Sequence, residues 1–142
     1  MAQRVTISKK ERKQLISLAT FLPILTAPDF SFGAWKDCVQ LANGTWMLTH
    51  FEFSAEAKRF FDATYDLGCV DLEFDWIAWS TTEEARSHLD DHRLIGTATP
   101  EQLRKLLTMS VRMDRYCEGS LAGDFESGLL LALMRRAAAL AS

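Results

Sequence analysis

The sequence predicts a mainly α-helical protein, a compact bundle of about five helices with one extended arm or minimal β pairing. Three observations support this fold class. Apolar residues recur at helical spacing along most of the chain, capping residues stand before several of those segments, and only residues 46–53 have the aromatic, extended character of a strand. The length of 142 residues favours a single domain spanning residues 1–142.

The N-terminal third is expected to hold one helix and a long connection. Ser8 and Glu11 form a capping-box pattern, and apolar residues follow it at helical spacing. Residues 25–45 have no regular pattern, and we expect a short helical turn at 35–41 because long structureless segments are uncommon. The run 46–53 is expected to be an extended arm lying on helices, because a lone strand cannot satisfy its own hydrogen bonds.

Four further helices are expected in the rest of the chain. The first is residues 54–68, capped by Ser54 and stopped by Gly68, and the second is residues 81–93. The third is residues 99–119, where Thr99 is the cap, Pro100 takes the first position and Gln102 completes the capping box. The fourth is residues 121–140, with a kink near Gly123 or Gly128. The last of these is apolar around much of its girth. It is therefore either the central helix of the bundle or part of a dimer interface.

Composition and charge argue against several classes of protein. The chain is 48% hydrophobic and 25% charged, without an apolar stretch of the length that a secretion signal or a bilayer span needs, so we expect a cytoplasmic protein. Cys38, Cys69 and Cys117 fit neither a disulfide framework nor a zinc pattern.

Residues 62–91 hold nine acidic residues against one arginine, which disfavours a nucleic-acid partner. No nucleotide or other cofactor motif is present, and no cofactor is expected.

Aromatic residues are concentrated in one part of the chain. Twelve of the fifteen lie between Phe30 and Trp79. We expect them in the core, because aromatic side chains contribute much of the burial in small domains. The alternative is a ligand pocket lined by tryptophans from the set Trp35, Trp46, Trp76 and Trp79.

Residues 100–117, projected on a helix, separate into two faces. The apolar face comprises Leu103, Leu106, Leu107, Ser110, Met113, Asp114 and Cys117; the opposite, basic face comprises Arg104, Lys105, Thr108, Arg112 and Arg115. Cys117 is therefore expected to pack as a small hydrophobic residue. Asp114 needs a partner on its apolar face, either an arginine of another helix or the backbone N–H groups at the start of the last helix. A catalytic role for this carboxylate is a further alternative.

A polar cluster surrounds the end of this helix. Arg112 and Arg115, three residues apart, can hold one phosphate or carboxylate together, or they can face the acidic residues 62–91. The candidate ligand-binding residues are Arg112, Arg115, Tyr116, Glu118 and Glu126. Cys117 is also a candidate nucleophile, which the nearby arginines favour and the helix C-terminus opposes.

The run from Leu106 to Ala137 resembles the C-terminal signature of an uncharacterised bacterial family, known only as a domain of unknown function. The signature residues are Arg112, Arg115, Tyr116, Cys117, Glu118 and Gly119, followed by Glu126 and Gly128. The LPIL and FSFGAW segments and the arm before residue 54 are also similar to that family. The resemblance implies one small domain and brings no established activity. The residues to which we assign a structural role are Asp114, Cys117, Gly119 and Gly128.

Glu84, His88 and His92 are spaced four residues apart on the predicted helix 81–93. Such a row offers three ligands to zinc or another divalent ion. A solvated helix surface explains the same row, and no second ligand-bearing helix is evident. We therefore expect no metal site, with this row as the weak candidate.

The leading functional hypothesis is a non-enzymatic binding or interaction module that pairs with itself as a homodimer or with another protein. The alternative is an enzyme acting on a phosphorylated or nucleotide-like small molecule, with Arg112 and Arg115 holding the anion and Glu118, Glu126 or Asp114 transferring a proton. An enzyme requires these side chains to converge on an open cleft. A binding module requires a contiguous exposed apolar patch or a large symmetric interface.

Overall fold

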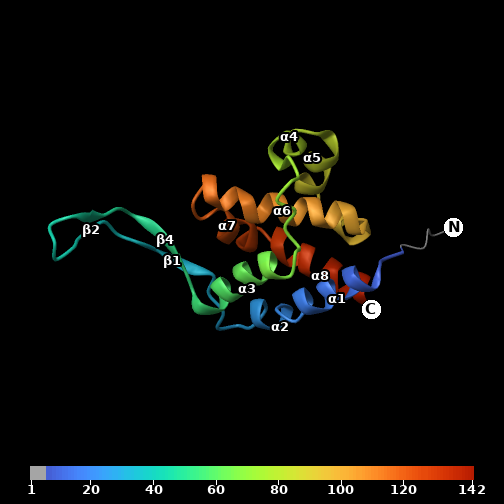
Figure 1. Cartoon of the computed structure of the whole chain (residues 1–142), viewed down its shortest axis with the longest axis horizontal. Helices are drawn as coiled ribbons and strands as arrows, with labels where there is room; N and C mark the ends of the chain where they lie inside the picture. The colour runs from blue at the N-terminus through green and yellow to red at the C-terminus, as the bar shows by residue number, and fades with distance from the viewer. Residues whose placement is uncertain (1–5) are drawn as a thin grey trace.

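The computed structural model describes residues 6–142 as a body of helices from which a long β-hairpin projects (Figure 1). The helices are α1 (Lys9–Ala19), α2 (Leu22–Leu25), α3 (Ala55–Asp66), α4 (Trp76–Ser80), α5 (Glu83–Asp90), the 3-10 helix η1 (His92–Thr97), α6 (Pro100–Tyr116), α7 (Ser120–Glu126) and α8 (Leu129–Ala141). The strands are β1 (Gly33–Lys36), β2 (Val39–Gln40), β3 (Trp46–Met47) and β4 (His50–Phe53). The prediction of a mainly helical fold is confirmed. The described residues form eight α-helices, however, rather than about five.

The additional helices have two origins. α2 and α4 are short, with four and five residues. α2 follows α1 just before the connection expected at 25–45, and α4 lies between the predicted helices 54–68 and 81–93. The predicted helix 121–140 is divided into α7 and α8, because Gly128 has a left-handed φ of 89° between them. The break is therefore at Gly128, while Gly123 lies inside α7.

α8 is the central helix of the body, which is the first of the two positions that the sequence left open. It packs against α1, η1, α6 and α7, and in Figure 1 it runs between α1 and α6. Its fully buried side chains are Leu130, Leu133, Met134 and Ala137. Arg136 connects it to the start of α6, donating from Nε to the main-chain oxygen of Ala98 at 2.8 Å.

The main helices begin where their capping residues predict. The Ser8 hydroxyl accepts from the N–H of Glu11, and the Glu11 carboxylate accepts from the N–H of Ser8. Thr99 and Gln102 form the same reciprocal pair at the start of α6. Ser54 caps α3. These local hydrogen bonds satisfy N–H groups that have no partner inside the helix.

α6 is buried on more sides than the two-face pattern predicts. Thr108, expected on the solvated face, is fully buried, and its hydroxyl accepts from the N–H of Asp71 at 3.0 Å. Met109 and Val111 are also buried, because α4, α7 and α8 all pack against this helix. Cys117, expected to pack as a small hydrophobic residue, is instead exposed, because the helix has ended and the chain is turning there.

The hairpin, residues 33–53, forms an arm that extends away from the helices (Figure 1). β1 pairs antiparallel with β4, and β2 pairs antiparallel with β3. Asn43 and Gly44 close the hairpin, with Gly44 at a left-handed φ of 87°. The expected helical turn at 35–41 is therefore wrong, and so is the expectation that the arm lies on helices. The alternative of minimal β pairing is correct. In each antiparallel pair, the main-chain N–H and C=O groups of one strand bond to those of the other, which a lone strand cannot do.

The predicted helix 81–93 is also shorter than expected. α5 ends at Asp90, and Asp91 is extended, with φ of −136° and ψ of 97°. The Asp91 carboxylate accepts from the N–H of Arg93 at 3.1 Å and so opens η1. His92 consequently lies outside the helix that carries Glu84.

Candidate functional site

The arm exposes large apolar side chains along its length. They are Trp35, Val39, Leu41, Trp46, Met47 and Leu48. Trp46 is 61% exposed and Leu48 is 73% exposed, values that core residues never approach. The expectation that the aromatic cluster forms the core therefore holds only for the body, where Trp76 and Trp79 are buried.

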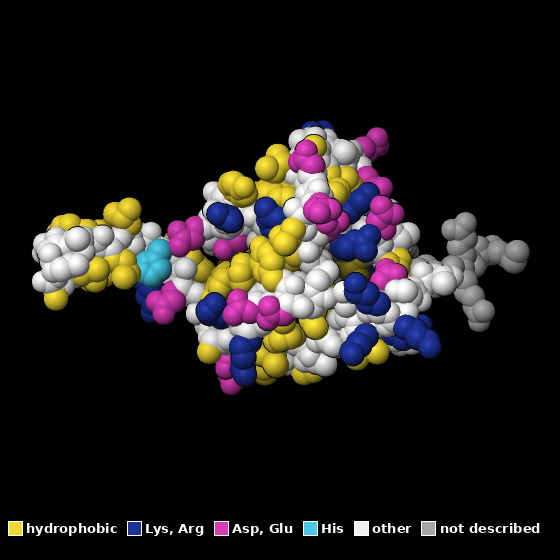
Figure 2. All heavy atoms as spheres, in the orientation of Figure 1, with side chains coloured by type: hydrophobic (Ala, Val, Ile, Leu, Met, Phe, Trp, Pro, Cys, Tyr) yellow, Lys and Arg dark blue, Asp and Glu magenta, His cyan; other side chains and the backbone are white. Residues whose placement is uncertain are grey.

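The outer arm, residues 39–49, carries no Asp, Glu, Lys or Arg. Figure 2 shows this part as hydrophobic and uncharged surface, and charged side chains begin only at its base. Lys36, Asp37, His50 and Glu52 lie there. Soluble proteins usually protect an exposed strand edge with charges or proline. The outer arm has neither, so it is a surface suited to apolar contact.

The turn between α6 and α7 holds the base of the arm. Glu118 Oε1 accepts a 2.7 Å hydrogen bond from the main-chain N–H of Phe51 in β4. Next to it, Gly119 has a φ of 88°, and a Cβ atom built there would lie 2.6 Å from a ring carbon of Trp35. Glycine is thus required both by the backbone conformation and by the close approach of the indole.

A row of aromatic rings continues from the base of the arm into the body. Trp35 meets Phe51 at 5.4 Å between ring centroids, Phe51 meets Phe53 at 5.8 Å, and Phe53 meets Phe61 of α3 at 5.4 Å. Phe53 also contacts the buried ring of Phe32. Three of these four contacts are edge-to-face, and the Phe53–Phe61 pair is tilted. Aromatic pairs of this kind add stability beyond simple burial. The inner half of the arm is therefore fixed to the body, while the outer half projects from it.

The candidate ligand-binding residues have separate surroundings. Glu118 contacts the arm, whereas Tyr116 is exposed and lies 5.9 Å from the Trp76 ring. Arg115 and Glu126 are exposed, and Arg112 is half-buried. Within residues 6–142, no hydrogen bond or ion pair joins any two of these five side chains.

The basic face of α6 lies only partly against the acidic segment 62–91. Lys105 Nζ is 5.6 Å from the centroid of the Phe74 ring, and it pairs with Glu101 of its own helix at 3.3 Å. Among the described side chains, neither Arg112 nor Arg115 forms an ion pair. Both arginines therefore retain donors for a further contact.

Asp114 ties α6 to α7. Its Oδ1 accepts from the main-chain N–H of Leu121 at 3.0 Å, which is the second of the two partners expected from the sequence. Leu121 lies in the first turn of α7, so the carboxylate satisfies an otherwise unpaired helix N–H. This contact fixes the turn that carries Glu118 and Gly119.

A second carboxylate, Asp124 of α7, was not singled out from the sequence. Its Oδ2 accepts a 2.5 Å hydrogen bond from the Ser110 hydroxyl of α6. Burial raises the pKa of Asp124 above its ordinary value, and nearby Asp114 adds to this, while Ser110 and His92 act in the opposite direction. The sequence did contain one sign of this contact: Ser110 is a polar residue on the apolar face of the predicted helix, and a buried hydroxyl needs a polar partner.

The metal-ligand row does not assemble. Glu84 Oε1 accepts from the indole N–H of Trp79 at 3.1 Å, and His88 is buried with Nδ1 2.8 Å from the main-chain oxygen of Glu84. His92 belongs to η1 instead. In the part of the chain that the structure describes, no three His, Cys, Asp or Glu side chains are placed to hold a metal ion.

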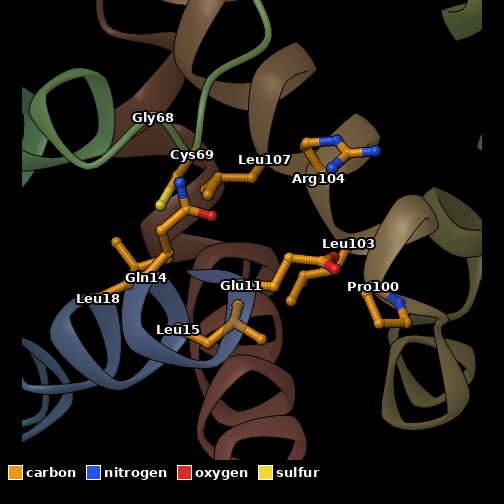
Figure 3. Close-up of a pocket in the computed structure, with 10 residues that line it drawn as sticks. All are labelled: Glu11, Gln14, Leu15, Leu18, Gly68, Cys69, Pro100, Leu103, Arg104 and Leu107. Atoms are coloured by element: carbon orange, nitrogen blue, oxygen red, sulfur yellow. The ribbon is translucent and has the colours of Figure 1, made fainter. Parts of the chain in front are cut away.

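A small pocket opens between α1 and α6 (Figure 3). Its volume is about 40 Å³, well below the roughly 300–1,000 Å³ of small-molecule sites. Gln14 spans one side and donates from Nε2 to the main-chain oxygen of Leu67 at 2.8 Å. Burial raises the pKa of Cys69 in its wall to about 11, so this thiol stays protonated near neutral pH. The pocket therefore offers neither room for a metabolite nor a reactive thiolate.

The model of DUF6508, a family of unknown function, matches residues 10–142. The chain belongs to the DUF6508 family. This confirms the expected membership in a family without an assigned function, and the match extends over nearly the whole chain, arm included. No curated protein and no solved structure matches the chain significantly.

Sequence reasoning about this DUF6508 protein missed its arm as a site. Val39 and Leu41 were assigned to a connection, Trp46, Met47 and Leu48 to an arm lying on helices, and the tryptophans to the core or a ligand pocket. The Asn43-Gly44 turn between two short extended runs was a hairpin sign. None of the helices within residues 6–142 has the length and apolar character needed to cross a bilayer.

Proposed function

We propose that this protein is a non-enzymatic interaction module and that its arm is the contact element. One observation carries the proposal: an uncharged outer arm projects from the body and exposes Val39, Leu41, Trp46, Met47 and Leu48 to solvent. Large exposed apolar patches on soluble proteins usually mark interaction sites. Tryptophan in particular is enriched among the residues that dominate binding energies.

The construction of the arm supports the same function. A two-stranded hairpin is at best marginally stable alone in water. Here its base is secured by Glu118, by Gly119 and by the row of aromatic rings. The body thus presents the outer arm in a defined position, which lowers the ordering cost when a partner binds.

The chemistry of the arm favours a protein partner over nucleic acid. Binding of single-stranded nucleic acid combines stacking aromatics with a basic groove. The arm has exposed Trp35 and Trp46, but Lys36 is its sole Lys or Arg and Asp37 stands next to it. An uncharged apolar surface is complementary to another apolar surface.

The alternative function, an enzyme on a phosphorylated small molecule, has less support. Its proposed anion ligands, Arg112 and Arg115, do not line the pocket between α1 and α6. Glu118, one of its proposed proton-transfer groups, is occupied by the N–H of Phe51. Stabilisation of the protein by inorganic phosphate, lost in Arg112→Ala and Arg115→Ala variants, would favour this alternative.

Site-specific photo-crosslinking tests the proposed function. A photoreactive amino acid is placed at Leu48 on the arm and, as a control, at Leu72 on the body, which is 66% exposed. After irradiation in cells, we expect protein adducts from position 48 and few from position 72. Equal adduct formation at both positions, or no adduct from position 48, would contradict a contact role for the arm.

A further inference from the structure

The outer arm carries apolar side chains on both of its faces. In an antiparallel pair, residues opposite each other share a face, and successive residues of one strand alternate between the faces. Val39 lies opposite Met47 on one face, and Gln40 lies opposite Trp46 on the other. Leu41, two residues after Val39, extends the first face. All four of these apolar side chains are exposed, and Figure 2 shows hydrophobic side chains on both the upper and the lower side of the arm.

Contact with a single flat surface covers only part of this apolar area. If a partner packs on the face of Val39 and Met47, the indole of Trp46 stays in water, and a partner on the other face leaves Val39 and Met47 in water. A second arm stacked on one face leaves the opposite face of each copy exposed. Both faces are buried together only when the partner has two walls, one on each side of the hairpin.

The dimensions of the hairpin define the space that it needs. Protein layers that pack face to face on a sheet lie about 10 Å from it, so two walls enclosing the hairpin stand roughly 20 Å apart. Residues 39–43, which lead from the base of the outer arm to its turn, extend roughly 15 Å at about 3.3 Å per residue. The partner therefore needs a deep cleft.

Charged side chains indicate how far the arm enters such a cleft. Lys36, Asp37, His50 and Glu52 lie at the base, and residues 39–49 carry no Asp, Glu, Lys or Arg. Stable interfaces have an apolar centre and a polar rim that stays in contact with water. An arm inserted turn first has this arrangement, because its uncharged end lies inside and its charged base remains at the mouth. Contact along the whole length of the arm would bury those charges.

Lipid does not provide a suitable space for the arm. A hairpin in the hydrocarbon layer leaves the main-chain N–H and C=O groups of its outer edges without partners, a cost that only helices and closed barrels avoid. Within the described residues, β2 and β3 pair only with each other, so each has an open outer edge. An arm lying in the lipid interface would bury one face only. A protein cleft can bury both faces and also supply polar groups to the edges.

The hollows beside the helices are unsuited to the arm of a second copy. The pocket between α1 and α6 has a volume of about 40 Å³. The hollow beside α2, of about 480 Å³, has the carboxylates of Asp29 and Glu56 in its wall, and an uncharged arm would remove them from water without compensation. The depression at the ends of α1 and α8, lined by Ile16 and Ala138, is nearly flat. We therefore expect the cleft on a different protein.

We propose that the outer arm inserts, turn first, into an apolar cleft of a different protein, whose two walls contact both faces of the hairpin. This inference rests on the proposed function and specifies its partner. One wall receives the aliphatic side chains of Val39, Leu41 and Met47, and the other receives the indole of Trp46. Both walls are uncharged, because residues 39–49 offer no counter-charge.

Gln40 and Thr45 give access to the two faces without loss of an apolar side chain. Gln40 shares the face of Trp46, and Thr45, two residues before Met47, shares the other face. A photoreactive amino acid is placed at each position in turn. After irradiation in cells, both positions are expected to form adducts with the same protein, through different peptides of that protein. Adducts from only one position would overturn the two-walled cleft.

Lysine substitutions at the same two positions test whether the walls are uncharged. Gln40→Lys and Thr45→Lys each add one charge to one face. Each is expected to lower the adduct yield from a photoreactive residue at Leu48 by about tenfold or more, because a buried charge without a partner is strongly unfavourable. Thr97→Lys, at an exposed position on the body, is the matched control and should leave the yield unchanged. Circular dichroism confirms that each variant is folded. A full yield from either folded arm variant would overturn the inference.

The identity of the adducts separates this inference from the proposed function. A single different protein, linked from both Gln40 and Thr45, supports both. A different protein linked from one face only, or a second copy of the chain, overturns the cleft and leaves the arm as an interaction site. Adducts with lipid, or none from any position on the arm, overturn both.

Discussion

Glu118 and Gly119 are adjacent residues that both act on the base of the arm. Glu118 supplies an acceptor for a strand N–H, and Gly119 supplies space for an indole together with a left-handed backbone. Both contacts are made within the chain. At this scale, the function of the turn is to position the β-hairpin.

Gly119→Ala should destabilise the protein by about 1–3 kcal/mol, because alanine is strained at positive φ and its Cβ would collide with Trp35. Urea unfolding measures the change. Gly123→Ala is the control, since Gly123 lies within α7 with open space around it, and it should be neutral or stabilising by up to about 1 kcal/mol. Equal effects of the two substitutions would refute the packing role of Gly119.

Asp124 makes stability depend on pH. Its pKa is raised in the folded state above the ordinary 3.8, so the folded protein binds this proton more tightly than the unfolded chain. The free energy of unfolding therefore falls as pH rises from below 3.8 through the raised pKa. Asparagine at position 124 does not ionise, so the Asp124→Asn variant does not lose this part of the free energy of unfolding as pH rises. It should therefore unfold at a higher temperature than the native protein at neutral pH. Asp66→Asn, at an exposed carboxylate, is the control; a lower melting temperature for Asp124→Asn would contradict the assignment.

At the scale of elements, α7 depends on its contacts with α6. It has seven residues, too few for a stable helix in isolation. Asp114 holds its first turn, and Ser110 holds Asp124 on its side. Because α7 follows the turn that secures the arm, these two contacts connect the core of the body to the position of the hairpin.

Asp114→Ala should cost about 1–2 kcal/mol, the typical loss for a helix-capping acceptor. Asp114→Asn keeps an oxygen in the same place and should cost much less. Thermal unfolding monitored by circular dichroism distinguishes them. If the two variants lose the same stability, the hydrogen bond to Leu121 is not what Asp114 contributes.

At the scale of the whole molecule, the body contains the hydrophobic core and the outer arm is exposed surface. The core lies among the helices, with α8 at its centre, while residues 39–49 lie outside it. Folding of the body therefore does not require the outer arm. In the proposed function, the outer arm makes its contacts with a partner protein.

Replacing residues 37–49 by Asn-Gly joins Lys36 directly to its register partner His50 through a two-residue turn. The shortened protein should keep its helical circular dichroism, because no helix is touched. Its melting temperature should stay close to that of the full chain, because the buried core lies among the helices and outside residues 39–49. A shortened chain that fails to fold would show that the arm belongs to the folding unit.

Local features of the fold were predictable from the sequence, and distant pairings were not. The caps at Ser8 and Thr99 depend on residues three positions away, so they are visible in the sequence. The arm depends on the pairing of residues 33–36 with 50–53, which no local pattern specifies. Thr108 was misplaced because a helix projection does not show that neighbouring helices cover several sides of α6.

The site was predictable only in part. Glu118 and Gly119 were selected from a crowded polar run, but their contacts are with Phe51 and Trp35, far away in the chain. The partner of Asp114 was predictable because the start of the next helix follows it closely. The exposed Trp46 was not, since composition alone assigns aromatic residues to a core.

The hydrogen bond from Phe51 to Glu118 involves the main chain of the strand and no side chain beyond the glutamate. Every amino acid except proline offers the same N–H group. Residues 39–49 take no part in this bond, so their sequence can change while the base of the arm stays in place. This makes the chain a natural starting point for grafting other recognition loops onto a helical base.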